Sequence, residues 1–169
     1  RIRQRHATGH AVTGNLIERW MSMNELQAAV KVVLANSFVM YFKAHSYHWN
    51  VEGINFTQYH DFFGGLYEEV YGAIDAIAEH IRAVDGYAPI SLADLVQAST
   101  LGEDNAKPAN IKLMLTNLQK ANNEVIDALN GAFMVAQKQN LQGLCNFLAD
   151  RLDIHAKHAW QIKSSLKAQ

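Results

Sequence analysis

The sequence lacks the features that mark several common classes of protein. It contains one cysteine, Cys145, so no disulfide can form within the chain. That thiol lies in an apolar helical pattern, where core packing is its expected role, and a reducing, cytoplasmic compartment is favoured. No run of 18 apolar residues occurs, which predicts that no helix crosses a membrane. The basic N-terminus lacks the apolar segment of a signal peptide.

Charge and glycine patterns exclude further classes. The net charge is −1, so the chain as a whole is not an obvious binder of polyanions. Hydrophobic residues make up 49% and charged residues 18%, which excludes bulk disorder. No glycine-rich phosphate-binding loop and no zinc-protease helix motif is present. A chain of 169 residues with this composition is expected to form one compact domain.

Proline is also scarce, and its positions indicate where helices end. Only Pro89 and Pro108 occur, and both fall between long segments with helical periodicity. The pattern predicts an N-terminal arm over residues 1–21 and an all-α domain over 22–169. The expected long helices cover about 22–49, 57–84, 108–138 and 141–166, with a short helix over 91–98. The long connection over 85–108 can cross the bundle, which predicts a ferritin-like four-helix bundle.

The second expected helix carries two carboxylates on one face. Asp75 and Glu79 are four residues apart in an otherwise apolar strip, and a carboxylate removed from water needs a partner. His60 is on the same helix, but 15 residues before Asp75, or roughly 22 Å along the axis. One metal ion cannot join these groups within a single straight helix.

Two copies of this helix can bring the groups together. When they pack antiparallel about a two-fold axis, His60 of one copy lies opposite Glu79 of the other, and Gly64 lies opposite Asp75. His48, at the end of the first expected helix, can reach the same place across a short turn. We therefore expect His48 and His60 from one subunit to meet Asp75 and Glu79 from its mate, twice per dimer.

This set of ligands has two interpretations. Two imidazoles and two carboxylates suit Fe(II), Zn(II) or Mn(II), and open coordination positions favour redox chemistry on iron. The same groups can instead form a buried histidine–carboxylate hydrogen-bond network between subunits. The spacing alone does not decide between them.

The residues around these positions resemble the signature of the Dps proteins, ferritin-like proteins that protect DNA in starved cells. The resemblance covers roughly residues 24–166. It is carried by His48-Trp49-Asn50-Val51, Gly53, Asn55-Phe56, His60, Tyr67, Asp75 and Ala78-Glu79, with Ala149-Asp150-Arg151 and Lys157-His158-Ala159-Trp160 later in the chain.

The resemblance implies a dodecameric hollow cage with ferroxidase centres at its two-fold interfaces. Such centres oxidise Fe(II) with hydrogen peroxide or oxygen and supply a ferric mineral core. By position, the resemblance makes His48, His60, Asp75 and Glu79 iron ligands, and it gives neighbouring Trp49 the role of taking up stray oxidising equivalents. It also suggests that Asp150 and Asp153 line a three-fold pore through which iron enters. A solvated helix face is the other interpretation of those two aspartates.

One position departs from the family pattern. The family usually has a carboxylate one turn after the second histidine, and this chain has Gly64. Asp61 is about 100° off that face, and Glu68 lies about 12 Å along the axis from His60, so neither is a simple substitute. One well-held metal per site is expected, with a second one weak or absent. His80 stands where the family commonly has arginine. His45, one turn before His48, is either a ligand, a residue that supports a ligand or a packing residue.

Two other functions stay open at this point. The basic residues Arg1, Arg3 and Arg5 favour a DNA-binding arm, repeated over the subunits of a cage. Against this stand the net charge and the absence of a lysine-rich tail. The missing carboxylate at Gly64 favours a structural cage whose site is impaired or occupied by zinc.

Overall fold

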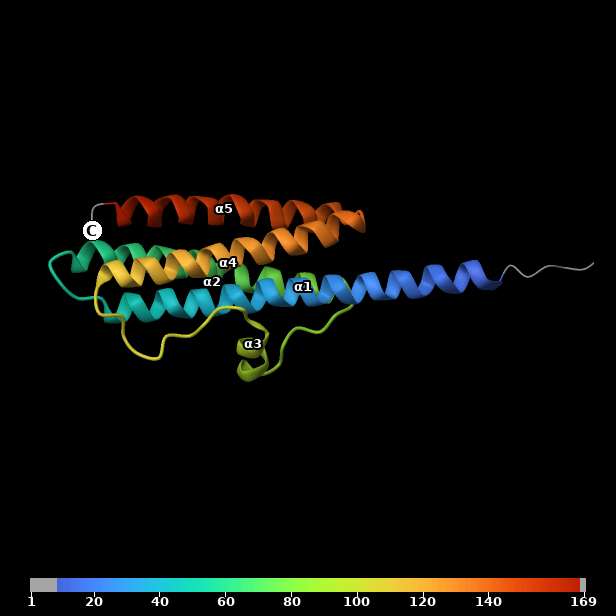
Figure 1. The fold of residues 1–169 in the computed structure, drawn as a ribbon, viewed down its shortest axis with the longest axis horizontal. Helices are drawn as coiled ribbons and strands as arrows, with labels where there is room; N and C mark the ends of the chain where they lie inside the picture. The colour runs from blue at the N-terminus through green and yellow to red at the C-terminus, as the bar shows by residue number, and fades with distance from the viewer. Residues whose placement is uncertain (1–8, 168–169) are drawn as a thin grey trace, which may run out of the picture.

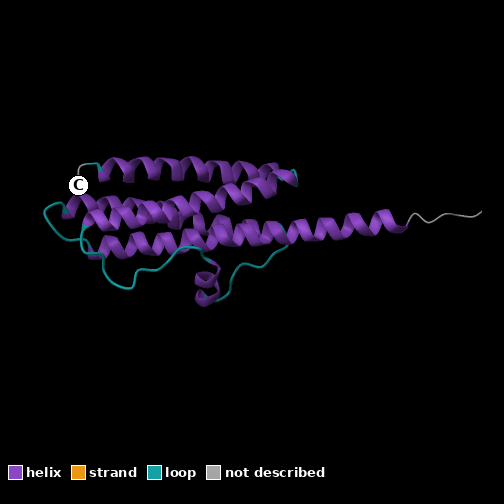
Figure 2. Cartoon of the chain, in the orientation of Figure 1, coloured by secondary structure: helices purple, strands orange, loops and turns teal. Residues whose placement is uncertain are grey.

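Four long helices lie side by side in the computed structural model, which describes residues 9–167 and the side chains of residues 16–167 (Figure 1). These are α1 (Gly9–Asn50), α2 (Phe56–Ala83), α4 (Ile111–Lys138) and α5 (Gln142–Leu166). A short helix, α3 (Leu92–Ala98), interrupts the connection between α2 and α4. Every regular element in the described part of the chain is a helix (Figure 2). The predicted all-α bundle with an extra short helix is confirmed.

Two of the predicted helix ends have the same backbone conformation and hydrogen-bond pattern. Asp85 and Asn140 adopt the left-handed region, with φ of 59° and 57°. After α2, the N–H of Gly86 donates to the carbonyl oxygen of Ile81 at 2.9 Å, and the end of α4 has the equivalent 3.1 Å bond from Leu141 to Ala136. This is the pattern of a Schellman motif, which satisfies carbonyls that the helix leaves unpaired.

Two helix starts differ from the predicted ones. Helix α1 begins at Gly9 rather than near residue 22, because no proline interrupts residues 9–22 and the helical backbone continues without a break. Helix α4 begins at Ile111 rather than at Pro108. Its cap is Asn110, whose side-chain oxygen accepts a 2.9 Å hydrogen bond from the N–H of Leu113.

The connection over residues 84–110 runs back along the bundle, so α2 and α4 point the same way (Figure 1). Helix α1 packs against both α2 and α4, and α4 packs against α5. Polar side chains of α1 fasten the connection to this core. The buried amide of Asn36 accepts from the N–H of Thr100 and donates to its hydroxyl, both at 2.9 Å. Lys43 forms a 2.9 Å ion pair with Asp104.

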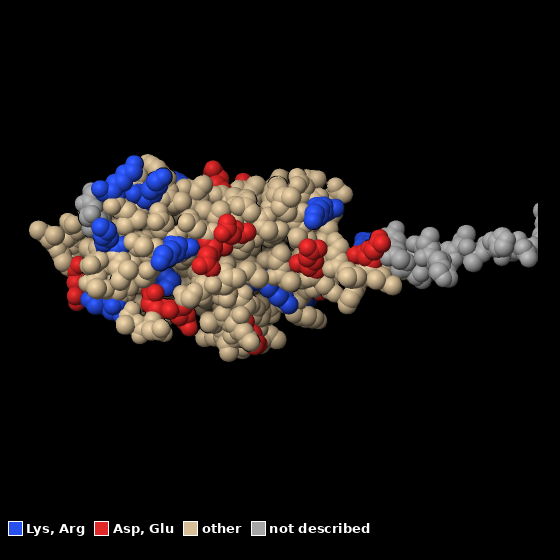
Figure 3. Space-filling view, in the orientation of Figure 1, with Lys and Arg blue, Asp and Glu red and all other residues tan. Residues whose placement is uncertain are grey.

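The surface carries charges of both signs. Acidic and basic side chains are scattered over the face shown in Figure 3, without one broad area of a single sign. No helix among the described residues is long and apolar enough to cross a membrane.

Candidate metal centre

The ends of α1 and α2 place two predicted ligands in direct contact. The imidazole rings of His48 and His60 are stacked, with centroids 3.7 Å apart and planes inclined by 25°. Nδ1 of His48 lies 2.7 Å from the backbone oxygen of His60, and Nδ1 of His60 lies 2.9 Å from that of His48. The short turn at residues 51–55 makes this reciprocal contact possible, because it reverses the chain within five residues.

These hydrogen bonds determine which ring nitrogen is available. A carbonyl oxygen only accepts, so Nδ1 must carry the proton in both rings. In the neutral tautomer, Nε2 of each histidine then has a free lone pair. This arrangement is typical of metal-binding histidines, in which one nitrogen binds the ion while the other donates to a carbonyl or carboxylate. The two residues therefore fit a divalent transition metal.

Gly64 lies against the ring of His48. A Cβ atom added at Gly64 would stand 3.3 Å from Nδ1 of His48, which is tighter than nearly all real contacts of this kind. Any side chain at this position, including the carboxylate that the family pattern has, requires the ring to move by a few tenths of an ångström. The glycine thus permits the observed close pair of histidines, at the cost of one acidic ligand.

The predicted carboxylate ligands are not near these histidines within one chain. Asp75 and Glu79 are exposed on α2 and lie on one face, as predicted. Neither carboxylate makes a hydrogen bond or an ion pair with another described residue, although the charge of Glu79 acts on the neighbouring His80. Within residues 9–167 of a single chain, no group of three or more histidine, cysteine or acidic side chains is arranged to hold a metal ion.

Aromatic residues surround the histidine pair. The ring of His45, one turn before His48 on α1, is stacked on Tyr67 at 3.9 Å and lies 4.1 Å from Trp49. Burial and the neighbouring charge of His48 lower the pKa of His45. Large side chains around this face are exposed in the single chain: Phe42, Trp49, Ile54, Phe56 and Tyr71.

A second polar cluster joins α2, α4 and α5, and no signal in the sequence predicted it. Arg151 forms an ion pair with Glu69 and lies 3.1 Å from Nε2 of the fully buried His155. Nδ1 of His155 donates to the side-chain oxygen of Asn122 at 2.7 Å. His158 contacts Glu69 at 2.8 Å. The partners are up to 89 residues apart in the sequence, so no local pattern reveals them.

The titration of this cluster follows from its contacts. Burial, together with the positive charges of Arg151 and His158, lowers the pKa of His155 to about 3. Burial alone would raise the pKa of Glu69, but hydrogen bonds from His158 and Arg151 and their charges lower it to about 2. At neutral pH, His155 is therefore neutral and Glu69 is ionised. The ion pair of Glu69 with Arg151 then joins α2 to α5, and the hydrogen bond of His155 to Asn122 joins α5 to α4.

The remaining predicted residues lie elsewhere. Asp150 and Asp153 are exposed on α5, and Trp49 is exposed beside the histidine pair. His80 packs on Phe147, with ring centroids 4.4 Å apart, and burial lowers its pKa. The residues proposed for a DNA-binding arm, Arg1, Arg3 and Arg5, lie outside the described part of the chain.

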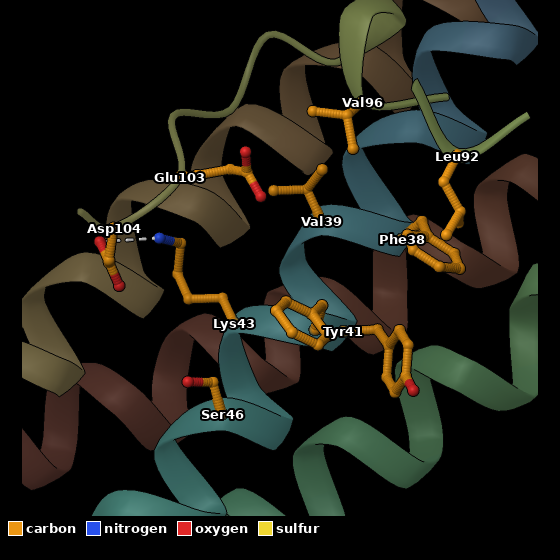
Figure 4. Close-up of a pocket in the computed structure, with 10 residues that line it drawn as sticks. Phe38, Val39, Tyr41, Lys43, Ser46, Leu92, Val96, Glu103 and Asp104 are labelled. Carbon is orange, nitrogen blue, oxygen red and sulfur yellow. Dashed lines mark ion pairs between the residues drawn. The ribbon is translucent and has the colours of Figure 1, made fainter. Parts of the chain in front are cut away.

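The most apolar cavity lies between α1 and the connection that carries α3. It has a volume of about 430 Å³ and is lined by Phe38, Val39, Leu92 and Val96, with the Lys43–Asp104 ion pair at one end (Figure 4). None of the predicted ligands lines it, so it is not the candidate metal centre.

Comparisons with known proteins match most of the chain. The ferritin-like domain family matches residues 27–168. A DNA protection during starvation protein of Brevibacillus brevis is 31% identical over 150 residues, covering 84% of this chain and 97% of that protein. A low temperature-induced protein of Nostoc sp. is 30% identical over 137 residues, covering 80% and 76%.

Solved structures have the same fold. The crystal structure of a Dps protein from Bacillus brevis superposes with a TM-score of 0.82 at 25% identity, covering 86% of this chain and 97% of that one. Dps from Staphylococcus aureus gives a TM-score of 0.79 at 28% identity, covering 85% and 95%.

Proposed function

The chain belongs to the Dps family of ferritin-like proteins, and from that premise we propose that it oxidises Fe(II) at sites shared between subunits. The oxidant is hydrogen peroxide or oxygen, and the ferric product is stored in a cage, which limits oxidative damage. The observation that carries the proposal is the His48–His60 pair. Both rings commit Nδ1 to backbone carbonyls and leave Nε2 free for iron.

The acidic half of the proposed centre comes from a second copy of the chain. Asp75 and Glu79 are exposed and unpaired in the described single chain, and antiparallel pairing of two α2 helices brings them opposite Gly64 and His60. The exposed aromatic residues around the histidines are expected to be covered by the same contact. We propose a homo-oligomer, a dodecamer by the family pattern, in which each dimer has two centres.

The proposed reaction balances with two iron ions per peroxide. Each Fe(II) gives one electron, and hydrogen peroxide takes two electrons and two protons to form two water molecules. Trp49, exposed next to His48, is proposed to supply an electron when a second iron is absent. Asp150 and Asp153, exposed on α5, are proposed to line the pore through which Fe(II) enters.

The direct test is peroxide or oxygen consumption after Fe(II) addition, with wild-type protein and with His60→Ala. Loss of a ligand should lower the rate by more than the roughly 10- to 100-fold that loss of a supporting residue costs. Lys163→Ala is the control, since Lys163 is exposed on α5 and outside the proposed ligand set, and its rate should stay near wild type. Equal rates in all three proteins, or no mineral core, contradict the proposal.

DNA binding is a second candidate function, favoured by the basic residues Arg1, Arg3 and Arg5, which precede α1 in the sequence. Helix α1 itself continues past the end of the bundle (Figure 1). Repetition of the three arginines over a cage would bind a nucleic acid by avidity. Gel-shift titrations at rising salt test this idea, and absence of retardation even at low salt removes it.

Gly64 favours a third candidate, a cage whose centre is impaired or occupied by zinc. Its test is the number of ions bound per site after anaerobic loading with Fe(II) and, separately, with Zn(II). One tightly bound iron fits a centre with a missing carboxylate. Two irons per site exclude an impaired centre.

A further inference from the structure

His45 is the histidine beside the proposed centre that the ligand set leaves unused. It lies one turn before His48 on α1, and the two ring centroids are 6.1 Å apart. Tyr67 stacks on the His45 ring at 3.9 Å with an angle of 18°, while the Trp49 centroid is 4.1 Å away. The ring is therefore held in an aromatic slot, so its orientation is restricted.

The ring nitrogens of His45 have no partner in the described part of the chain. Nδ1 is buried and forms no hydrogen bond, whereas Nε2 is not buried and makes no hydrogen bond with another described residue. Buried polar atoms without a hydrogen bond are rare in folded proteins and indicate an ion, a water molecule or a functional role. The only other described case is Nδ1 of His158, whose Nε2 already contacts Glu69. His45 thus differs in that neither ring nitrogen is paired, and only Nε2 is open to a group from outside the chain.

Only Nε2 of His45 can meet a group from outside the chain, because Nδ1 is closed off from solvent within the single chain. We therefore expect its partner on the face that a second subunit is proposed to cover. In the antiparallel pairing of α2 helices, Tyr67 lies opposite Gly72 of the partner subunit. Gly72 is exposed, and apart from its chain neighbours and the adjacent backbone of α2, no atom of the chain lies within 4 Å of the place where a Cβ would stand. Asp75 of the partner subunit is three residues further along, roughly 4.5 Å. The slot that holds His45 therefore faces the acidic half of the centre.

The distance between the two rings suits one shared ion. A metal–imidazole bond of about 2.0–2.1 Å puts the ion roughly 3.2 Å from the ring centre, so two rings on one ion have centroids up to about 6.4 Å apart. The observed 6.1 Å is inside this limit. For a tetrahedral angle at the ion, the centroids of the two rings must move closer together by about 1 Å.

We propose that His45 is a third imidazole ligand, which shares with His48 an ion held by Asp75 and Glu79 of the partner subunit. The inference rests on the intersubunit arrangement of the proposed function. It makes the centre richer in nitrogen than the two-histidine set. Imidazole suits Zn(II), Cu(II), Ni(II) and iron, whereas carboxylate favours Mn(II) and Mg(II). His45 therefore raises the affinity for zinc more than that for manganese.

The first test is titration of the assembled, metal-free protein with Zn(II) and with Mn(II), for wild type and His45→Phe. Phenylalanine keeps an aromatic ring between Tyr67 and Trp49 and removes both nitrogens. Zinc affinity should fall by at least about 10-fold, and manganese affinity should fall less. Trp160→Phe is the control, because it changes an exposed aromatic ring on α5 that is outside the proposed ligand set. Zinc affinity equal to wild type in His45→Phe overturns the proposal.

The second test is a crystal structure of the zinc-loaded protein with anomalous diffraction. An ion within about 2.0–2.2 Å of a His45 nitrogen supports the proposal, and an ion bound only by His48, His60, Asp75 and Glu79 overturns it. Failure of the two proposals is distinguishable. If the wild-type protein binds no zinc at these residues, the intersubunit centre itself is wrong. If it binds zinc and His45→Phe binds it equally well, only the role of His45 is wrong.

Discussion

Two histidine pairs in the same bundle use their ring nitrogens in opposite ways. His48 and His60 are stacked 3.7 Å apart at the joint of α1 and α2, and each gives only Nδ1 to the protein. His155 and His158 lie 5.4 Å apart on α5, at 83° to each other. There, Nε2 of His155 meets Arg151 and Nε2 of His158 meets Glu69.

The difference lies in what each pair offers to other molecules. The first pair, here called the open pair, presents free lone pairs on a face rich in exposed aromatic residues. The second, here called the closed pair, is buried and joins three helices through Asn122, Arg151 and Glu69. Histidines in one fold can therefore serve binding or stability, and their hydrogen bonds distinguish the two roles.

The largest effect is expected on stability, when the closed pair is broken. Arg151→Met leaves Glu69 and buried His155 without their cationic partner, which should lower the free energy of unfolding by about 3 kcal/mol. This value is the lower end of the range that is usual for removing one partner of a buried ion pair, and it is chosen because the Glu69 side chain is 32% exposed. Chemical denaturation measures the change, and Lys163→Met, at an exposed lysine of α5 with no salt bridge to another described residue, should cost less than about 1 kcal/mol.

Iron oxidation per folded subunit should be unchanged in Arg151→Met. If Arg151→Met lost as much iron oxidation as His60→Ala, the closed pair would contribute to oxidation as well as to stability. The division of roles between the two pairs would then be wrong.

The next largest effect is expected when two inactive variants are mixed, which tests whether the open pair forms its centre with acidic residues of a second subunit. His60→Ala and Glu79→Ala subunits should each be nearly inactive in iron oxidation. When they are refolded together with random pairing, half of the dimers are mixed, and one of the two sites in each mixed dimer is intact. The mixture should therefore recover about a quarter of wild-type activity. A mixture as inactive as its components would place all four ligands in one subunit.

The closed pair should also make stability depend on pH. The pKa of His155 is about 3 in the folded protein, against an ordinary value of 6.5 in the unfolded chain. Below pH 6.5 the unfolded chain therefore binds a proton that the folded one does not. The contribution of His155 to the free energy of unfolding is therefore fully present above pH 6.5, and it is lost progressively as the pH falls toward 3. The Glu69 contribution is present above pH 4.5 and is lost as the pH falls toward 2, because the folded state lowers the pKa of that carboxyl.

Thermal unfolding at pH 7.5, 5.5 and 4.5 measures this dependence. His155→Gln should show a smaller fall in Tm between pH 7.5 and 4.5 than wild type, because it removes the proton uptake of the unfolded state. Parallel curves for the two proteins would mean that another group causes the acid sensitivity.

The smallest effect is expected at Gly64. Gly64→Ala gains about 1 kcal/mol of helix propensity, but its Cβ meets Nδ1 of His48 at 3.3 Å. Stability should stay close to wild type while iron affinity falls a few-fold, as measured by anaerobic titration. Gly64→Asp adds the acidic ligand as well, so more iron should bind per site. Equal iron binding by both variants would indicate that the missing carboxylate is not what limits the centre.

Part of the fold could be predicted because it depends on local sequence. The ends of α2 and α4 follow from Asp85 and Asn140, residues that tolerate the left-handed conformation. The common face of Asp75 and Glu79 follows from helical spacing alone. The start of α1 could not be predicted in this way, because residues 9–22 contain no feature that forces a helix to begin or to end.

The candidate site was predicted only as a set of residues. The spacing from His48 to His60 indicates a short turn, but not that each ring would bond to the carbonyl of the other residue. The closed pair was missed entirely, since Glu69 and Arg151 are 82 residues apart. Such contacts depend on how whole helices pack, which local periodicity does not report.

The sequence by itself therefore determined the helices, their order and the identity of the residues with metal-binding chemistry. These properties depend on backbone preferences and on spacing within one helix. The tertiary structure decided which histidine nitrogens stay free, because that choice is made by carbonyls and side chains that reach each ring from another helix.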